Sequence, residues 1–233
     1  MANFPSDTSP NNNSIIPVST ELCAKHMQIT IPSPWIQRFA HLVKRDARVL
    51  DLAAGGGRHG RFLLSRSSHV TFIDKEVGAL EDLEKEPKAT VLRADVEGKV
   101  SPFSDDGVLQ NMQFDAVIVV NYLFRPLLNG LIEVIAPGGI LLYETFARGN
   151  EAFARPRNPD HLLKNQELLA TVAGRMQIVA YEHGVMQTGD IPGVKQRICA
   201  TKDLVDSGSE NDIPPPICSQ SNNTEPCKPR LKA

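Results

Sequence analysis

The chain has 233 residues, a formal net charge of −2, 41% hydrophobic residues and 22% charged residues. These values are typical of a soluble globular protein with one sizeable core, and the charge gives no support for nucleic-acid binding, which usually needs a strong positive excess. No apolar run approaches the roughly 20 residues of a membrane span, and the N-terminus lacks the pattern of a secretory signal. We therefore expect no nucleic-acid partner and no membrane partner.

The two ends of the chain differ in composition from its middle. Residues 1–30 are rich in Asn, Ser, Thr and Pro, and residues 203–233 contain a proline run and a stretch of Ser and Asn. Such segments bury too little apolar surface to fold, so we expect a disordered N-terminal segment, a folded domain over 31–202 and a disordered C-terminal tail. The four cysteines lack metal-ligand spacing, which predicts reduced thiols, a cytoplasmic location and no metal site.

Within the folded region, segments typical of strands alternate with segments typical of helices. The predicted strands are Arg48–Ala53, Val70–Asp74, Thr90–Ala94, Phe114–Asn121, Gly139–Phe146, Gln177–Glu182 and Val194–Ala200. Apolar residues at helical spacing predict helices over 34–45, 58–67, 76–86, 124–136 and 161–174. The residues Pro137-Gly138-Gly139 are expected to end the fourth helix before the next strand.

This alternation predicts an α/β fold: a doubly wound, mostly parallel, seven-stranded Rossmann-like sheet with helices on both faces. The run Val117–Val120 is apolar on both faces, as expected for a central strand covered by helices. Only about ten residues connect the last two predicted strands. Because a helical crossover needs more, we expect an antiparallel strand at the C-terminus.

The first strand leads from Asp51 into a glycine cluster that begins at Gly55, and a predicted helix follows. Glycines allow a tight turn and a close approach of ligand to backbone, as in nucleotide-like cofactor sites. The spacing Gly55-x-Gly57-x-x-Gly60 also fits the dinucleotide fingerprint and keeps a nicotinamide-dependent oxidoreductase as an alternative. A carboxylate at Asp51 would repel a pyrophosphate, however, and favours the cationic head group of S-adenosylmethionine. A local capping role of Asp51 is the other interpretation.

Further polar residues follow the next strands of the predicted sheet. Asp74 and Asp95 come at successive strand ends, where a carboxylate suits the hydroxyls of a ribose and the amino group of an adenine. Asn121 ends the central strand and is expected to face the cofactor. Helix-capping and turn roles remain alternatives for all three. Asp115 begins its strand, so we place it at the opposite edge and exclude it from the site.

Several motifs resemble, in order, those of class I S-adenosylmethionine-dependent methyltransferases. They are Val49-Leu-Asp-Leu-Ala-Ala-Gly-Gly-Gly57, Phe72-Ile-Asp74, Ala94-Asp95, Phe114-Asp-Ala-Val117 and Ala136-Pro-Gly-Gly-Ile-Leu-Leu-Tyr143. Asn121-Tyr-Leu-Phe-Arg-Pro-Leu-Leu128 and Tyr143-Glu-Thr-Phe-Ala-Arg-Gly-Asn150 resemble the bacterial tellurite-resistance-type branch. The resemblance spans roughly residues 32 to 201.

The resemblance implies that S-adenosylmethionine is the methyl donor. It places Asp51, Gly55 and Gly57 around the methionine part, Asp74 at the ribose, Asp95 with Val96 at the adenine, and Asn121 at the inner wall. The resemblance also makes Ala53 a cofactor-binding residue. Ala53 and Ala54 stand where the family usually has Gly and often Cys. The extra methyl group of Ala53 is tolerable if that residue keeps a negative φ.

The implied activity is methyl transfer to a small-molecule acceptor by in-line displacement, with a non-catalytic S-adenosylmethionine-binding module as an alternative. The acceptor-side candidates, chosen by position alone, are Tyr122, Arg125, Glu144, Arg148, Asn150, Arg155 and Arg157. Their four arginines suit an anionic acceptor or form a solvated rim. Trp35 is a candidate for an N-terminal lid. His59 and His161 are possible bases, but solvent-facing helix positions are the preferred interpretation.

Overall fold

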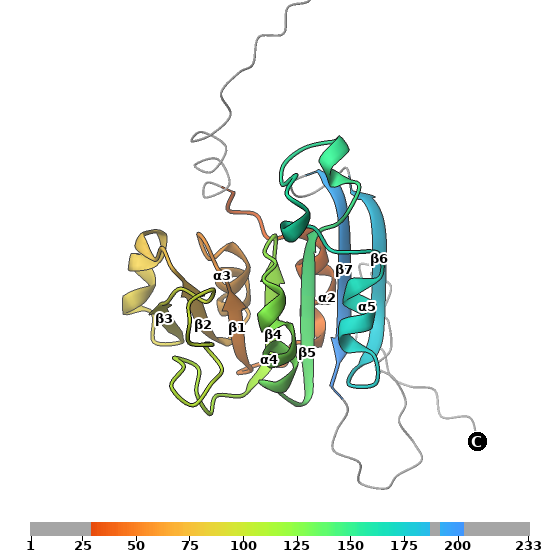
Figure 1. The fold of residues 1–233 in the computed structure, drawn as a ribbon. Coiled ribbons are helices and arrows are strands. Elements are labelled where there is room, and N and C mark those ends of the chain that lie inside the picture. The colour runs from red at the N-terminus through yellow and green to blue at the C-terminus, as the bar shows by residue number, and fades with distance from the viewer. Residues whose placement is uncertain (1–28, 187–191, 203–233) are drawn as a thin grey trace, which may run out of the picture.

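A computed structural model describes residues 29–186 and 192–202. Nearly all of the two predicted disordered ends, and the cysteines other than Cys199, lie outside the described residues. The described chain forms one α/β unit around a seven-stranded sheet (Figure 1). Within those ranges, no helix combines the length and apolar character that crossing a membrane requires.

All seven predicted strands are present in the sheet. They are β1 Arg48–Leu52, β2 His69–Asp74, β3 Ala89–Arg93, β4 Phe114–Val120, β5 Ile135–Phe146, β6 Gln177–Met186 and β7 Gly193–Thr201. The strand order is β3-β2-β1-β4-β5-β7-β6. The first five strands are parallel, whereas β7 runs antiparallel to both β5 and β6. The doubly wound sheet and the antiparallel C-terminal strand are therefore confirmed.

The helices are shorter than predicted, and some are 3-10 turns. The α-helices are α2 Pro34–Phe39, α3 Arg58–Leu64, α4 Leu128–Glu133 and α5 Glu167–Val172. The 3-10 segments are η1 Ala40–Leu42, η2 Gly78–Lys85, η3 Arg125–Leu127, η4 Asn150–Ala152 and η5 Pro159–His161. Helices α2 and α3 cover one face of the sheet and α4 and α5 the other (Figure 1). Short helices suffice because packing on the sheet, rather than helix propensity, supplies most of their stability.

The prediction that Pro137-Gly138-Gly139 ends a helix was wrong. Helix α4 already ends at Glu133, and these three residues lie inside β5, where its register with β4 shifts. The pairing jumps from Phe114↔Ile135 to Ala116↔Ile140, so the extra residues of β5 form an irregularity. A proline is compatible with this position because a register irregularity leaves backbone groups outside the regular ladder.

Candidate functional site

Two adjoining cavities lie at the edge of the sheet where the parallel strands end. The larger cavity has a volume of about 910 Å³ and the smaller one about 190 Å³. The larger cavity is lined by Ala53, Asp74, Lys75, Ala94, Asp95, Val96, Glu97, Asn121, Tyr122, Leu123, Thr145, Phe146, Arg155, Pro156, Arg157, Asn158 and His161. The smaller cavity is lined by Ile29, Asp51, Ala53, Ala54, Gly55, Gly56, Arg58, His59, Val120 and Asn121. Ala53 and Asn121 line both cavities and thus mark their junction.

Asp51 is buried in β1 beneath the glycine turn. Its side chain is 1% exposed, and its Oδ2 accepts a hydrogen bond from the Gly60 backbone N–H at 2.8 Å. Both interpretations of Asp51 therefore have support, because the carboxyl group caps α3 and also lines the smaller cavity. Burial raises the pKa of Asp51 from 3.8 to about 7, although the Gly60 N–H and the Arg58 charge oppose this shift.

The raised pKa makes the stability of the protein depend on pH. Between about pH 4 and pH 7 folded Asp51 keeps a proton that the unfolded chain releases. Rising pH should therefore lower the free energy of unfolding through this group, by at most ~1.4 kcal/mol per pH unit. Urea denaturation of the wild-type chain and of Asp51→Asn at pH 5 and pH 7 checks this. The variant should gain stability relative to wild type as the pH rises, and equal pH dependence in the two proteins would contradict the assignment.

Gly57 and Gly60 must be glycine for different structural reasons. Gly57 has φ 72°, and a Cβ there would lie 2.6 Å from Leu80 Cδ2. A Cβ on Gly60 would lie 2.2 Å from Phe72 Cε1, so only glycine lets α3 pack this closely on the sheet. Close helix–strand packing is also the role of the last glycine in the dinucleotide fingerprint. The match to that fingerprint thus reflects shared packing geometry and is not specific for a dinucleotide.

The condition under which the methyl group of Ala53 is easily tolerated, a negative φ, is not met. Ala53 has φ 54° and Asn121 has φ 57°, so both residues that mark the junction of the cavities have a left-handed backbone conformation. This conformation costs an alanine roughly 1–2 kcal/mol, whereas asparagine tolerates it better. Strain of this kind is typical of functional sites, where the surrounding structure holds the backbone in place.

The two carboxylates predicted for the adenosine part of the cofactor both lie at the larger cavity. Asp74 accepts hydrogen bonds from the backbone N–H of Gly55 at 2.8 Å and of Glu76 at 2.9 Å. Asp95 accepts one from the Glu97 N–H at 3.0 Å. The Glu76 and Glu97 contacts are local turn contacts, as considered for Asp95, whereas the Gly55 contact joins β2 to the glycine turn. Asp74 does not cap the next helical segment, which begins at Gly78. Because a carboxylate has about four lone-pair sites, the same groups can still accept hydrogen bonds from a ligand.

Tyr122 follows Asn121 into the wall of the larger cavity. Its hydroxyl is buried and has no hydrogen-bond partner among the described residues. Burial, and then the negative charge of Glu97, raise the pKa of Tyr122 well above its usual range. The hydroxyl therefore stays protonated beside Glu97.

Three acceptor-side candidates are engaged elsewhere and line neither cavity. Arg125 binds both carboxylate oxygens of Glu167, at 2.7 and 2.9 Å, and braces the segment after β5. Arg148 pairs with Glu151 at 3.2 Å near the surface. Asn150 is buried, and its side chain contacts backbone groups of Ala154, Pro156 and Val194. As predicted, Arg125 follows β4, and Arg148 and Asn150 follow β5, but the three side chains stabilise the loops and do not face a cavity.

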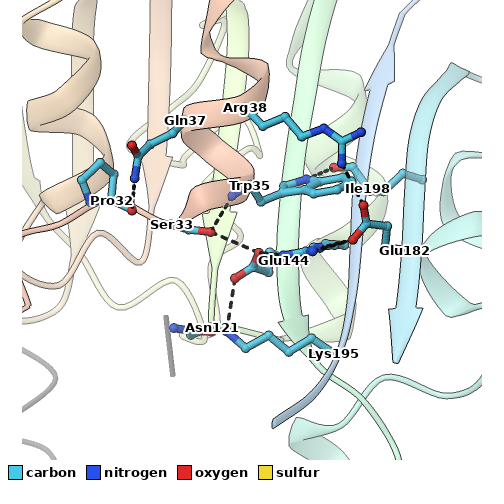
Figure 2. A network of polar contacts seen from close by, with 11 residues as sticks. Pro32, Ser33, Trp35, Gln37, Arg38, Asn121, Glu144, Glu182, Lys195 and Ile198 are labelled. Atoms are coloured by element: carbon cyan, nitrogen blue, oxygen red, sulfur yellow. Dashed lines mark hydrogen bonds and ion pairs between the residues drawn. The ribbon is translucent and has the colours of Figure 1, made fainter. Parts of the chain in front are cut away.

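Glu144, a fourth acceptor-side candidate, also lines neither cavity. It is 1% exposed and lies in a polar network between the sheet and α2 (Figure 2). Its Oε1 lies 3.1 Å from Lys195 Nζ, and its Oε2 accepts a hydrogen bond from Ser33 Oγ at 3.1 Å. Lys195 was not predicted, because a run of three polar residues between Val194 and Ile198 gives no signal for a buried lysine.

The lid predicted at Trp35 and the solvent-facing position predicted for His59 were both wrong. Trp35 is 1% exposed, and its Nε1 donates to the Ile198 carbonyl at 3.2 Å, so it belongs to the core. His59 is buried against the smaller cavity. His161 is exposed at the larger cavity, where Arg155 and Arg157 also lie.

Comparison with solved structures supports the fold assigned to this chain. No family model and no curated protein matches the sequence. A SAM-dependent methyltransferase from Methanosarcina mazei matches over 75% of this chain and 99% of its own, with 17% identity and a TM-score of 0.54. TehB from Haemophilus influenzae matches over 72% of this chain and 61% of its own, with 17% identity and a TM-score of 0.56.

A third structure of this fold was solved with a ligand. The N-methyltransferase NodS from Bradyrhizobium japonicum, in complex with S-adenosylhomocysteine, matches over 78% of this chain and 97% of its own. The identity is 14% and the TM-score 0.54. The chain therefore has the fold of these methyltransferases, and the fold implied by the motif resemblance is confirmed.

Proposed function

We propose that this protein is a methyltransferase that uses S-adenosylmethionine and transfers the methyl group to a small-molecule acceptor. The observation that carries the proposal is the convergence of Asp51, the glycine turn, Asp74, Asp95 and Asn121 on two adjoining cavities. In open α/β sheets, ligands bind beyond the carboxyl ends of the strands, where these cavities lie. The fold shared with known methyltransferases supports the same activity.

The chemistry of the lining residues fits this cofactor. Asp74 would accept hydrogen bonds from the ribose hydroxyls, and Asp95 with the buried Val96 would hold the adenine. Asp51, in the smaller cavity, suits the ammonium of the methionine part, since a nearby cation favours its ionised form. S-adenosylmethionine supplies a methyl group on a positively charged sulfur, which a lone pair of the acceptor displaces in line.

The protein has a limited chemical task in such a displacement. It must align the acceptor with the methyl group and exclude water, and well-oriented proximity contributes roughly 7–11 kcal/mol. The segment that closes the larger cavity after β5 provides alignment through Arg155, Arg157 and His161. Tyr122, which keeps its proton, acts as a hydrogen-bond donor rather than as a base.

The distribution of charge in the larger cavity favours an anionic acceptor. Its acidic side chains, Asp74, Asp95 and Glu97, follow β2 and β3, whereas Arg155 and Arg157 follow β5. Because β5 lies on the other side of β1 and β4, these two arginines are placed away from the proposed adenosine site, whereas Lys75 lies beside Asp74. Guanidinium groups bind carboxylates and oxyanions well, so the acceptor is proposed to carry such a group.

Calorimetric titration with S-adenosylhomocysteine and with NADH tests the cofactor. The strand order with an antiparallel β7 differs from the 3-2-1-4-5-6 order of dinucleotide-binding folds, so binding of NADH is not expected. Turnover is then assayed on a panel of thiols, phenols, carboxylates and metalloid oxyanions. Release of S-adenosylhomocysteine with the anionic members supports the proposal. Binding of NADH alone contradicts it, and binding without turnover on any acceptor favours a non-catalytic module.

Asp74→Ala is expected to weaken binding of S-adenosylhomocysteine by about 1–3 kcal/mol, the usual cost of removing a charged hydrogen-bond partner. Asp115→Ala is the matched control, because that carboxylate binds the Arg48 N–H at 2.8 Å at the opposite edge of the sheet. Calorimetry should show a loss in the first variant only. Since Asp74 also holds Gly55, the unfolding of both variants is measured as well. Unchanged affinity in Asp74→Ala would remove this residue from the site.

A further inference from the structure

The ion pair between Lys195 and Glu144 is almost completely buried beside the candidate site. Their side chains are 1% and 2% exposed, and the Lys195 ammonium also lies 4.9 Å from the centre of the Phe146 ring. Burying two charges costs several kcal/mol of desolvation, and well-packed apolar residues often stabilise a fold equally well. Stability alone is therefore a poor explanation for this pair.

The Lys195 ammonium also contacts the residue at the junction of the two cavities. Its Nζ donates a hydrogen bond to Asn121 Oδ1 at 3.0 Å. An ammonium group has only donors, so the atom of Asn121 that faces it must be the oxygen and not the amide nitrogen. Figure 2 shows Lys195 between Glu144 and Asn121, with the amide nitrogen of Asn121 on the far side from Lys195. Lys195 thus fixes which end of the amide points into the site.

The backbone of Asn121 is held by β5, the strand that carries Glu144. Its N–H donates to the Glu144 carbonyl at 2.8 Å, and its φ is 57°. Glu144 therefore contributes to Asn121 twice, through its backbone and through the charge that compensates Lys195. Backbone and side chain of Asn121 are fixed together at the position where the cavities meet.

We propose that Lys195 is a positioning residue of the cofactor site, which orients the amide of Asn121 so that its Nδ2 donates to the carboxylate of the amino-acid part of the cofactor. This inference rests on the proposed function. The smaller cavity suits such a zwitterionic group, since Asp51 complements an ammonium and Arg58 complements a carboxylate. Glu144 compensates the Lys195 charge, which would otherwise repel an ammonium nearby.

Four proteins test the proposal: wild type, Asn121→Gly, the double variant Lys195→Met/Glu144→Gln, and the combination of all three changes. Glycine suits the positive φ at 121, and the double variant removes both charges of the buried pair together, so both are expected to fold. Calorimetry should give about tenfold weaker binding of S-adenosylhomocysteine for Asn121→Gly and for the double variant. The triple variant should bind no more weakly than Asn121→Gly, because Lys195 acts through Asn121.

Two controls locate the effect. Arg38→Met removes the more exposed ion pair of the same network, in which Arg38 lies 2.9 Å from Glu182, and leaves Glu182 paired with Arg197. It should bind S-adenosylhomocysteine like wild type. 5′-Methylthioadenosine, which lacks the amino-acid part, should bind all the proteins with equal affinity. Equal losses for both ligands would overturn the assignment to the amino-acid part.

Other outcomes overturn the role of Lys195 itself. Wild-type affinity in Lys195→Met/Glu144→Gln, or a loss that adds fully to that of Asn121→Gly, would show that Lys195 does not act through Asn121. If wild type binds no S-adenosylhomocysteine, the proposed function fails, and the NMR signals of the Asn121 side-chain amide still test the positioning in the ligand-free protein. These signals should shift in the double variant but not in the Arg38→Met control. Unchanged signals would overturn the proposal.

Discussion

Lys195→Met alone is expected to lower the free energy of unfolding by about 3–5 kcal/mol, because it leaves the buried Glu144 carboxylate without its main counter-charge. The second cation near this carboxylate is Arg197, whose guanidinium lies 3.7 Å from Glu144 Oε2 and is shared with Glu182. The hydroxyl of Ser33 offers only a neutral hydrogen bond. Neither partner replaces an ammonium that is itself buried. Urea denaturation at neutral pH measures the loss.

The double variant Lys195→Met/Glu144→Gln is the control for this prediction. It removes both charges at once, so its stability should lie close to that of wild type. A loss in the double variant as large as in Lys195→Met would mean that packing of the lysine stem, rather than the unpaired carboxylate, carries the effect. The pair of measurements thus separates the stability of the fold from the role of Lys195 at Asn121.

Trp35→Ala is expected to destabilise the protein by about 3–5 kcal/mol, as do other deletions of buried aromatic rings. The ring is 1% exposed, packs edge-on against Phe39 at a centroid distance of 4.7 Å and lies 4.8 Å from the Arg197 guanidinium. Helix α2 has only six residues, and its buried side chains, Trp35 among them, attach it to the sheet. Thermal or urea denaturation measures the effect.

Gln37→Ala on the same helix is the matched control, because Gln37 is exposed and its side chain donates a hydrogen bond to the nearby Pro32 carbonyl. It should change stability by no more than about 0.5 kcal/mol. The lid suggested by the sequence makes the opposite prediction for Trp35→Ala, namely normal stability with reduced turnover. That result would contradict the core position of the ring.

The residues whose position at the edge of the sheet was predicted correctly have signals in the adjacent sequence. Asp51, Asp74 and Asp95 each stand where an apolar run ends, and parallel strands bring such ends to one edge. The left-handed backbone at Ala53 was missed because alanine rarely adopts it, and no local pattern distinguishes an alanine held there by its neighbours. His59 was misplaced because a short helix packed on a sheet, with Gly60 in the contact, buries more of its surface than its polarity indicates.

The loop after β5 shows most clearly which side-chain positions the sequence does not predict. Arg148, Arg155 and Arg157 are equivalent by sequence, yet the first pairs with Glu151 and only the other two line the larger cavity. Their positions depend on how the loop folds back, with Asn150 bound to backbone groups of its own loop and of β7. Side chains far apart in sequence decide this path.

The seven strands, their grouping into one doubly wound sheet and the carboxylates where its parallel strands end follow from the sequence alone, because hydrophobic periodicity and strand ends are local features. Only the tertiary structure decided that Lys195 meets Glu144 and Asn121, which lie 51 and 74 residues away in the chain. Those contacts arise from the insertion of β7 between β5 and β6 and from the antiparallel register that aligns Glu144 with Arg197. A one-residue slip in that register would turn Lys195 to the other face of the sheet, and no residue next to Lys195 encodes the register.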